Sequence, residues 1–457
     1  MTIPAYVLED LAKMRPISGE WWSRAQRVIP DGSTSRRRLI PPHPFYASHG
    51  VGARLYDLDG NEYIDCVIGF GPHLLGHSHP VVVEALQTAA TRGTTYGAPH
   101  MDEVRFAELL TEAIPCAGKV NFVNSGSAST AAALRVARAL TGKPGLAKFE
   151  GGFHGGYDAV LGSFGIDPGK SGSEEDPEFH SVSFGAPKEN LVHTHVLPFN
   201  HEAAFDKIRR LASELAVVMV EGIQGHAGSI PVDRTFLQDL RRVCSETGVL
   251  LMFDEIITGF RLASGGAQEY YGVKADLATY GKVPGGGVPL GIIAGTDEVM
   301  AILESTGDPA RDLRERAYFG GTFNAGVLVT AVGVAVLHHL SEYPEVYDQV
   351  NRLGAGMRER LDALIREADV PAVVVGDGSL FGVRFVEEPV RSVRDLVDEN
   401  KAASGAMQAL LLRRGVFVTP SLGLLSVAHT ESDLDEIAEA FQGSFAVLRS
   451  VGVFDSA

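Results

Sequence analysis

The stretch KVNFVNSGSASTAAALRVARAL, residues 119–140, leads from a short apolar strand through a polar turn into a helix rich in Ala, Leu and Arg. The first N–H groups of such a helix lack partners within it, and the macrodipole favours an anion at that end. Gly126 permits close approach to the backbone, and the hydroxyl of Ser127 adds a hydrogen-bond donor. The segment predicts a phosphate site at Ser125, Gly126 and Ser127, although such a turn taken alone is more often only a helix cap.

On both sides of this stretch, from about residue 55 to 330, short apolar runs alternate with longer helical periods. That pattern is typical of a mainly parallel sheet covered by helices on both faces, so we expect an α/β core. In such sheets ligands bind at the carboxyl ends of the strands. The expected strands are residues 119–124, 145–149, 216–221, 249–254 and 277–280.

Composition excludes several classes of protein. The 457 residues, 45% of them hydrophobic, are enough for two to three domains and a large core. The 40 basic and 57 acidic side chains give a net charge of −17, which opposes binding to nucleic acid or to anionic lipid. Cys66, Cys116 and Cys244 lack CxxC spacing, so no disulfide framework is indicated. With no apolar run long enough for a membrane span and no secretory h-region, we expect a cytoplasmic protein.

Two strands place charged side chains at the predicted ligand edge. VLLMFDEIITGFR delivers Asp254 from a buried run, where a carboxylate needs a cation or a donor, although a helix cap is an alternative. DLATYGKVPGGGVPLG delivers Lys282, whose charged form is disfavoured by desolvation. A neutral amine attacks an aldehyde to form a Schiff base, whereas a lysine taken alone more often just extends along apolar surface.

Together the three elements match the needs of one cofactor, pyridoxal phosphate. It requires an amine for an imine, a carboxylate for its protonated ring nitrogen and a helix start for its phosphate. Here the chain resembles the class III aminotransferases of PLP fold type I, in the branch of the glutamate-1-semialdehyde aminomutases and β-amino acid aminotransferases. The resemblance covers nearly the whole chain and rests on LYDLDGNEYIDCVIGFGPHLLGHSHP, NFVNSGSAST, KFEGGFHGGYD, LLMFDEIITGFRLASGGAQEYYGV, DLATYGKVPGGGVPLG and GGTFN.

This resemblance implies the fold of the chain and its division into domains. It implies a large PLP-binding domain over residues 56–335 with a mainly parallel seven-stranded sheet. A smaller α+β domain follows from residues 336–457, and residues 1–55 contribute to it and to the substrate pocket. In this last part, AVVVGDGSLFGVRFV reads as two strands around a turn. Apolar spacings of three and four predict a helix over 346–364, and Thr430 with Asp433 predicts a capping box that opens another.

The resemblance also implies roles for single residues. Lys282 matches the lysine that forms the aldimine and later acts as general base, and Asp254 matches the partner of the ring nitrogen. Phe153, followed by His154, lies on one face of the ring, and Ile256 lies on the other. Thr322 in GGTFN matches a threonine that reaches the phosphate from the neighbouring subunit, which implies a homodimer with shared active sites.

Substrate recognition is predicted from two segments. In DGSTSRRRL, Ser35 and Arg38 fall on positions that resemble contacts to the substrate carboxylate, which a planar guanidinium suits, although a solvated basic loop is the alternative. His226 in EGIQGHAG either contacts the ring hydroxyl of the cofactor, gates the pocket or is a buried structural histidine. The polar stretch 163–190 is either a mobile lid or a solvated insertion without a role.

For the reaction we predict an aminotransferase, which moves an amino group from a small-molecule donor to a keto acid or aldehyde acceptor. The family's aminomutases carry a glutamate near the C-terminus, whereas VTPSLGLLSVAHTESD has no acid before Glu431. Asn324-Ala325-Gly326 looks like the β-amino acid aminotransferases, yet the arginine that they place before the last strand aligns with Ser421. An aminomutase or an epimerase shares the same core and stays an alternative, as does a catalytically silent scaffold.

Other chemistries fit less well. The segment from Gly165 to Ser171 is one residue short of a P-loop, and GDGSLFG does not open a helix as a nicotinamide-binding loop does. The spacing of His73, His77 and His79 suggests zinc, but no carboxylate completes the set, so no metal site is predicted.

Overall fold

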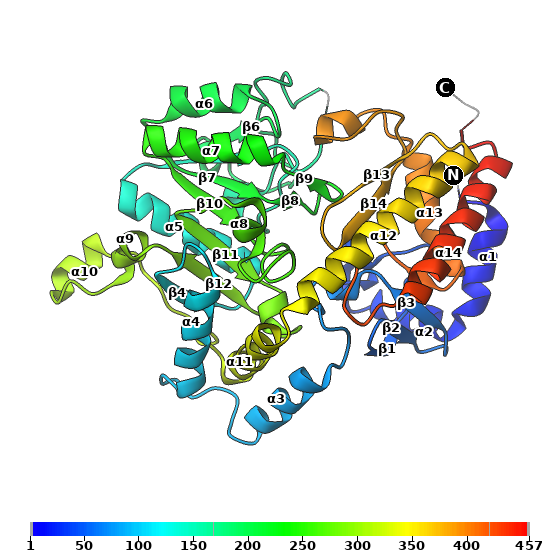
Figure 1. The fold of residues 1–457 in the computed structure, drawn as a ribbon, viewed down its shortest axis with the longest axis horizontal. Coiled ribbons are helices and arrows are strands. Elements are labelled where there is room, and N and C mark those ends of the chain that lie inside the picture. Colours follow the sequence, from blue (N-terminus) through cyan, green and yellow to red (C-terminus); the bar gives the residue numbers. More distant parts are fainter. Residues whose placement is uncertain (1–2, 168, 420, 455–457) are drawn as a thin grey trace.

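The computed structural model describes residues 3–167, 169–419 and 421–454, and it is built around a seven-stranded sheet (Figure 1). Only β12 runs antiparallel to its neighbours among these strands. The mainly parallel α/β sheet predicted from the sequence is therefore confirmed. In spatial order the strands are β4 (Lys119–Val123), β12 (Gly291–Gly295), β11 (Leu277–Gly281), β10 (Leu250–Asp254), β7 (Leu215–Glu221), β5 (Gly145–Phe149) and β6 (Thr194–Leu197).

All five predicted strands are present, and the sequence missed two. The sequence THVL of β6 has only four residues and follows a long irregular stretch, and GIIAG of β12 is bounded by glycines. The four residues of β6 are at the lower limit for a strand recognised from sequence, whereas β12 is as long as β4, β5, β10 and β11 but has only Ile292, Ile293 and Ala294 between its glycines. At Gly291, the first residue of β12, an added Cβ would collide with the carbonyl oxygen of Ser125. This strand therefore needs glycine where it passes the phosphate turn.

Apolar side chains cover both faces of this sheet. Met219, Met252 and Ile293 pack with α5 (Gly126–Thr141) in one cluster. Their strand neighbours, such as Val218, Phe253 and Ile292, belong to a second and larger cluster. This alternation buries the strands on both sides, which explains their nearly continuous apolar sequences. The other helices of this part of the chain are α3 (Pro80–Ala90), α4 (Met101–Ala113), α6 (Ala203–Leu211), α7 (Arg234–Thr247), α8 (Gly266–Tyr271), α9 (Asp297–Met300), α10 (Pro309–Glu315) and α11 (Val327–Glu342).

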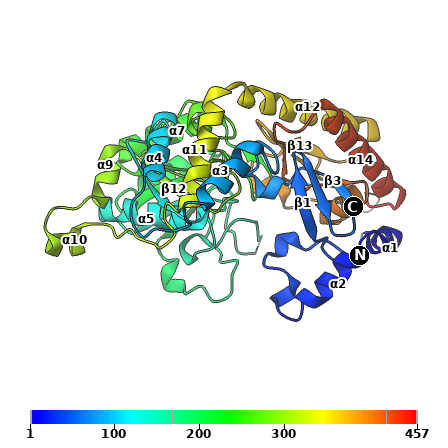
Figure 2. The same ribbon diagram turned by 90° about the horizontal axis from the view of Figure 1, so that it is seen from below.

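Smaller sheets accompany the seven-stranded one, and the N- and C-terminal parts of the chain meet in one of them (Figure 2). One has the order β1 (Ala47–Val51), β2 (Arg54–Asp57), β3 (Glu62–Asp65) and β15 (Val416–Phe417), with β15 parallel to β3. β3 lies beyond residue 56, where we expected the large domain to begin, and that boundary stays a prediction. The remaining strands are β13 (Val373–Val375), β14 (Leu380–Arg384) and β16 (Gly423–Leu424) in one sheet, and β8 (Ile223–Gln224) with β9 (Ile230–Pro231) in another.

Three predicted elements of the C-terminal part are found. β13 and β14 are the two antiparallel strands, and α12 (Glu345–Ala368) is the amphipathic helix. The hydroxyl of Thr430 accepts from the backbone of Asp433, whose carboxylate accepts in return, so the capping box opens α14 (Glu431–Ser450). α12 and α13 (Lys401–Arg413) both pack against α14, while α1 (Ala5–Met14) packs on α13 and α2 (Pro16–Ala25) follows α1. None of the helices in the described ranges combines the length and apolarity needed to cross a bilayer.

Short 3-10 helices connect these elements, and two of them carry arginines that contact distant parts of the chain. These are η2 (Arg36–Arg38) and η8 (Val393–Leu396). The others are η1 (Pro30–Gly32), η3 (Ile68–Phe70), η4 (Asp158–Val160), η5 (Lys188–Asn190), η6 (Val283–Gly285) and η7 (Ala301–Leu303).

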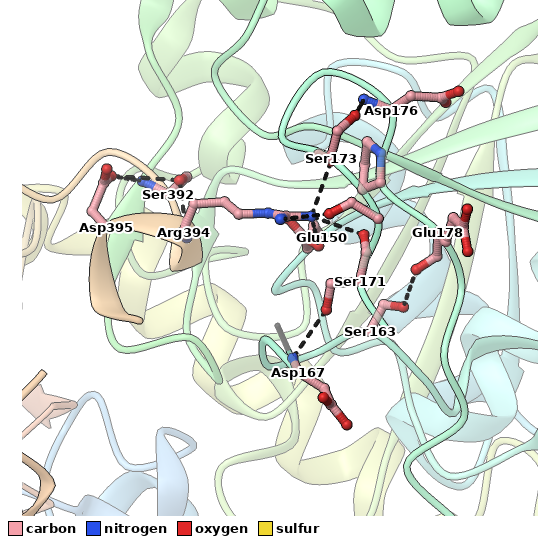
Figure 3. Close-up of polar contacts among 12 residues, drawn as sticks. Glu150, Ser163, Asp167, Ser171, Ser173, Asp176, Glu178, Ser392, Arg394 and Asp395 are labelled. Atoms are coloured by element: carbon pink, nitrogen blue, oxygen red, sulfur yellow. Dashed lines mark hydrogen bonds and ion pairs between the residues drawn. The ribbon is translucent and has the colours of Figure 1, made fainter. Parts of the chain in front are cut away.

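The polar stretch 163–190 is fastened by one arginine of η8 (Figure 3). Arg394 makes a two-pronged ion pair with the buried carboxylate of Glu150, at 2.6 and 2.8 Å. Its guanidinium also donates to the backbone carbonyls of residues 171–173, at 2.9 to 3.2 Å. The stretch is thus tied to both the seven-stranded sheet and the C-terminal part of the chain, and a role as a lid stays a prediction.

Candidate active site

A cavity of about 400 Å³ opens at the carboxyl ends of the central strands. Eleven of the twelve residues that the sequence singled out line it: Ser35, Arg38, Ser125, Gly126, Ser127, Phe153, His154, His226, Asp254, Ile256 and Lys282. Thr322, the twelfth, is exposed and does not line the cavity. Its predicted role concerned a neighbouring subunit and stays a prediction.

The start of α5 forms a polar cradle on one wall. The Ser125 hydroxyl caps the helix by accepting from the N–H of Ala128 at 3.1 Å, while the N–H groups of Gly126 and Ser127 lie in the first turn, where helices offer no internal acceptor. Two glycines allow the surrounding chain to pack closely against this helix start. At Gly155, where φ is +117°, a Cβ would lie 2.8 Å from the Ser127 Oγ, and at Gly126 one would lie 3.0 Å from Ile256.

Asp254 stands at the end of β10 with its carboxylate buried. One oxygen lies 2.8 Å from Nδ1 of His154, and the other accepts from the N–H of Ile256 at 3.1 Å. Burial lowers the pKa of His154, which Asp254 only partly opposes, so the imidazole is neutral near pH 7. The negative charge of Asp254 is therefore hydrogen-bonded but is not cancelled by a cation.

Glu221 is a second carboxylate of the site, which the sequence reasoning missed. It ends β7 directly beside Asp254 in the sheet register. Its oxygens accept from the N–H groups of Phe153 at 2.9 Å and Gly225 at 3.2 Å. Burial, and then the charge of Asp254, raise its pKa to about 8. The signal that identified Asp254, a buried apolar run ending in an acid, is equally present in AVVMVE at residues 216–221.

Lys282 follows β11 with an unusual backbone conformation, φ 53° and ψ −98°. Burial, followed by the charge of Arg261, lowers its pKa to about 8, so the neutral fraction of the amine at pH 7 is roughly one tenth, far more than in a free lysine. Arg261 was also missed from sequence. It is fully buried and donates to the backbone carbonyls of Gly71 at 2.6 Å and Leu425 at 2.9 Å.

Phe153 and His226 form an aromatic wall of the cavity. Their rings stack with centroids 4.7 Å apart at 21°, and Phe164 meets His226 edge-on at 4.7 Å. Nδ1 of His226 lies 2.7 Å from a guanidinium nitrogen of Arg37. The sequence offered no sign of this contact, because it joins residues 189 positions apart.

Residues 37–440 match the sequence profile of the family described as aminotransferase class-III. The chain belongs to the class-III aminotransferases. Among relatives, the glutamate-1-semialdehyde 2,1-aminomutase of Methanothermobacter thermautotrophicus is 39% identical over 437 residues, which cover 95% of this chain and 100% of that protein. Curated relatives of this name thus favour the aminomutase alternative over our main prediction.

Solved structures similar to this chain include transaminases. An omega-transaminase from Sphaerobacter thermophilus has a TM-score of 0.89 and 34% identity, with coverage of 94% of this chain and 98% of that one. A structure described as a transaminase with PLP bound has a TM-score of 0.86 and 31% identity, covering 96% and 99%. The predicted PLP fold type I is confirmed. The predicted cofactor is confirmed as well: this class-III enzyme uses pyridoxal phosphate.

The residues of the cavity fit that cofactor. Its walls bring together the amine of Lys282, whose pKa is lowered, the buried carboxylate of Asp254 and the helix start at Gly126, which were the three requirements recognised in the sequence. An added Cβ at Gly126 or Gly155 would press on Ile256 or Ser127, so the helix start and its neighbours pack closely only because these two positions lack side chains. Pyridoxal phosphate supplies an aldehyde for covalent attachment and a ring that withdraws electrons from a substrate carbon.

Proposed function

We propose that this enzyme is a transaminase, which transfers an amino group between two small molecules, an amino donor and a keto acid or aldehyde acceptor. One observation favours this over transfer within a single molecule. Asp254 and Glu221 are the only carboxylates among the described residues that line the cavity, and both lie at the sheet edge with their oxygens already hydrogen-bonded. The C-terminal segment contributes Leu422 to the wall rather than an acid.

This matters because a 2,1-aminomutase passes through a species with two amino groups, which has to stay bound while the nitrogen moves. A carboxylate facing that species would hold its second ammonium. A transaminase instead releases the first product before the second substrate enters. A cavity without such a carboxylate suits release.

In this proposal each side chain has a defined task. Lys282 provides the amine that carries the cofactor and afterwards moves a proton at the substrate carbon. Asp254 keeps the ring nitrogen of the cofactor protonated, and the N–H groups at the start of α5 hold its phosphate. Phe153 and Ile256 would cover the two faces of the ring, and Ser35 and Arg38 would contact the substrate.

The second candidate is a glutamate-1-semialdehyde-type aminomutase, and the curated relatives favour it. A single-turnover experiment separates the two. The pyridoxamine form of the enzyme is mixed with a panel of keto acids and aldehydes, and the absorbance of the pyridoxal form is followed. We expect at least one acceptor to regenerate it, with Lys282→Ala as the inactive control. If none does, and glutamate 1-semialdehyde alone is converted, the aminomutase is correct.

We also propose a homodimer in the cytoplasm, with Thr322 of each subunit contributing to the site of the other. Support comes from the exposure of Thr322 outside the cavity and from the family resemblance of its motif. Analytical ultracentrifugation measures the subunit number. Mixing Thr322→Ala with Lys282→Ala protein tests sharing, because re-assorted dimers would contain one intact site.

A further inference from the structure

Arg37 and His226 make a contact whose direction fixes the charge of the histidine. The distance from Nη2 of Arg37 to Nδ1 of His226 is 2.7 Å. A guanidinium can only donate, so Nδ1 must carry the lone pair and the ring proton must sit on Nε2. Burial, and then the charge of Arg37, hold the pKa of His226 at about 3. The imidazole is therefore a neutral acceptor.

Of the two residues, His226 is the one held in place by its neighbours. Its ring lies against Phe153 and Phe164 with centroid distances of 4.7 Å to each. Phe153 is in turn fastened to the sheet edge through its N–H, which donates to Glu221. Arg37, in contrast, lies on the three-residue helix η2 and is exposed. The histidine thus determines where the guanidinium lies, rather than the reverse.

The three consecutive arginines of η2 are not equivalent. Arg36 does not line the cavity. Arg38 lines it, but its guanidinium donates to the Thr34 hydroxyl of its own segment at 3.2 Å. Arg37 reaches across the cavity wall to a residue of the large sheet region. Among the three it is the one whose position is set by the site itself.

The charge of Arg37 has no counter-ion in the part of the chain that the structure describes. Its hydrogen-bond partner is neutral, and Glu221 acts on it only through space. One Nη2 contact leaves further N–H donors of the guanidinium free, in the planar arrangement that binds a carboxylate with two parallel hydrogen bonds. A cation presented in this way on a substrate cavity calls for an anionic ligand.

We propose that Arg37 binds a carboxylate of the substrate and that His226 is the positioning residue that holds Arg37 for it. Arg37 thereby determines specificity for substrates that carry a carboxylate in addition to the reacting amine or carbonyl. The proposal rests on the proposed function, because it names how the amino donor or the acceptor is held.

A binding experiment tests this without turnover. Glutarate, a dicarboxylate without a reacting group, is titrated into the holoenzyme by calorimetry. Arg37→Ala should raise its Kd about 10- to 100-fold, the range of a charge-assisted hydrogen bond. Arg36→Ala, on the same helix but outside the cavity, is the matched control and should bind like the wild type. No binding to the wild type, or equal binding to Arg37→Ala, overturns the proposal.

Two variants of His226 isolate its positioning role. His226→Phe keeps an aromatic ring against Phe153 but lacks the acceptor, so the Kd for glutarate should rise. His226→Asn offers a carbonyl oxygen in its place and should restore part of the affinity. Wild-type affinity in His226→Phe would refute the positioning role.

Kinetics then connect the contact to specificity. With 4-aminobutyrate as donor, Arg37→Ala should raise KM more than it lowers kcat, whereas with n-propylamine, which lacks the carboxylate, kcat/KM should change little. Equal losses for both donors would contradict the proposal. If the wild type turns over neither donor nor any other, the proposed function fails, and the glutarate titration still decides the role of Arg37.

Discussion

The carboxylate of Asp254 and the imidazole of His154 form a buried pair, with 2.8 Å between Oδ2 and Nδ1. An ionised carboxylate only accepts, so the histidine proton lies on Nδ1. Its Nε2 has no partner among the described residues. Since burial lowers the pKa of His154, the pair carries one net negative charge at neutral pH. That charge is oriented by the histidine and remains available to a protonated ring nitrogen.

Replacing this charge without changing its shape should impair the reaction strongly. We expect Asp254→Asn to lower kcat about 100- to 1000-fold, because an electrostatic partner aimed at the reacting system is lost. Steady-state kinetics of the cofactor-loaded variant measure this, and its melting temperature checks that the fold is intact. His154→Asn, which retains a donor to Asp254, should lose less. A fully active Asp254→Asn would show that Asp254 is only structural.

The lowered pKa of Lys282 predicts a pH dependence for cofactor attachment. Only the neutral amine attacks an aldehyde, so the attachment rate rises as pH increases through the pKa and then levels off. With a pKa of about 8 instead of 10.5, the plateau should begin soon above pH 8. Stopped-flow absorbance of apoenzyme mixed with pyridoxal phosphate measures the profile. Lys282→Ala gives the background, and a rate that keeps rising toward pH 10.5 would contradict the prediction.

Site residues could be predicted from the sequence where the local pattern indicates their place in the fold. Asp254 and Lys282 each follow an apolar run, and the edge of a parallel sheet gathers the ends of such runs. The same rule applied to residues 216–221 would have found Glu221.

Other parts of the site depend on contacts that no local pattern records. Arg37 contacts His226, which lies 189 positions later in the chain. Arg261 donates to the carbonyl oxygens of Gly71 and Leu425, which also lie far from it in the chain. Their positions follow from how the terminal parts of the chain pack on the sheet. The strand β12 was missed for a related reason, since its first glycine, Gly291, serves close packing against the Ser125 turn rather than strand propensity.

The ion pair of Glu150 with Arg394 should control the order of residues 163–190. Arg394→Met leaves the buried carboxylate of Glu150 without its cation and removes the donors to the carbonyls of 171–173. Loss of one partner of a buried pair costs about 3–5 kcal/mol, so we expect lower unfolding free energy in urea and faster proteolysis within this stretch.

Two control variants distinguish the effect of the Glu150–Arg394 ion pair from a general effect of mutating residues 163–190. The double variant Glu150→Gln with Arg394→Met removes the unpaired charge and should recover part of the stability. Lys170→Ala removes only an exposed pair with Asp167 and should leave the proteolysis rate unchanged. Equal stability of Arg394→Met and the wild type would show that the pair contributes nothing.

Two adjacent glycines provide a sharp test of the phosphate cradle. At Gly155, φ is +117°, and a Cβ would come within 2.8 Å of the Ser127 Oγ and 2.9 Å of its Cα. At Gly156 nothing lies within 4 Å of an added Cβ. We expect Gly155→Ala to lower the unfolding free energy by about 1–3 kcal/mol, the cost of a backbone conformation that alanine rarely adopts. Because the collision displaces Ser127, the affinity of the Gly155→Ala enzyme for pyridoxal phosphate should fall as well.

The neighbouring Gly156→Ala is the matched control. It keeps the N–H that donates to Ser127 at 3.2 Å, and it should match the wild type in both urea unfolding and cofactor titration. Equal cofactor affinity in the two variants would mean that Ser127 does not hold the phosphate.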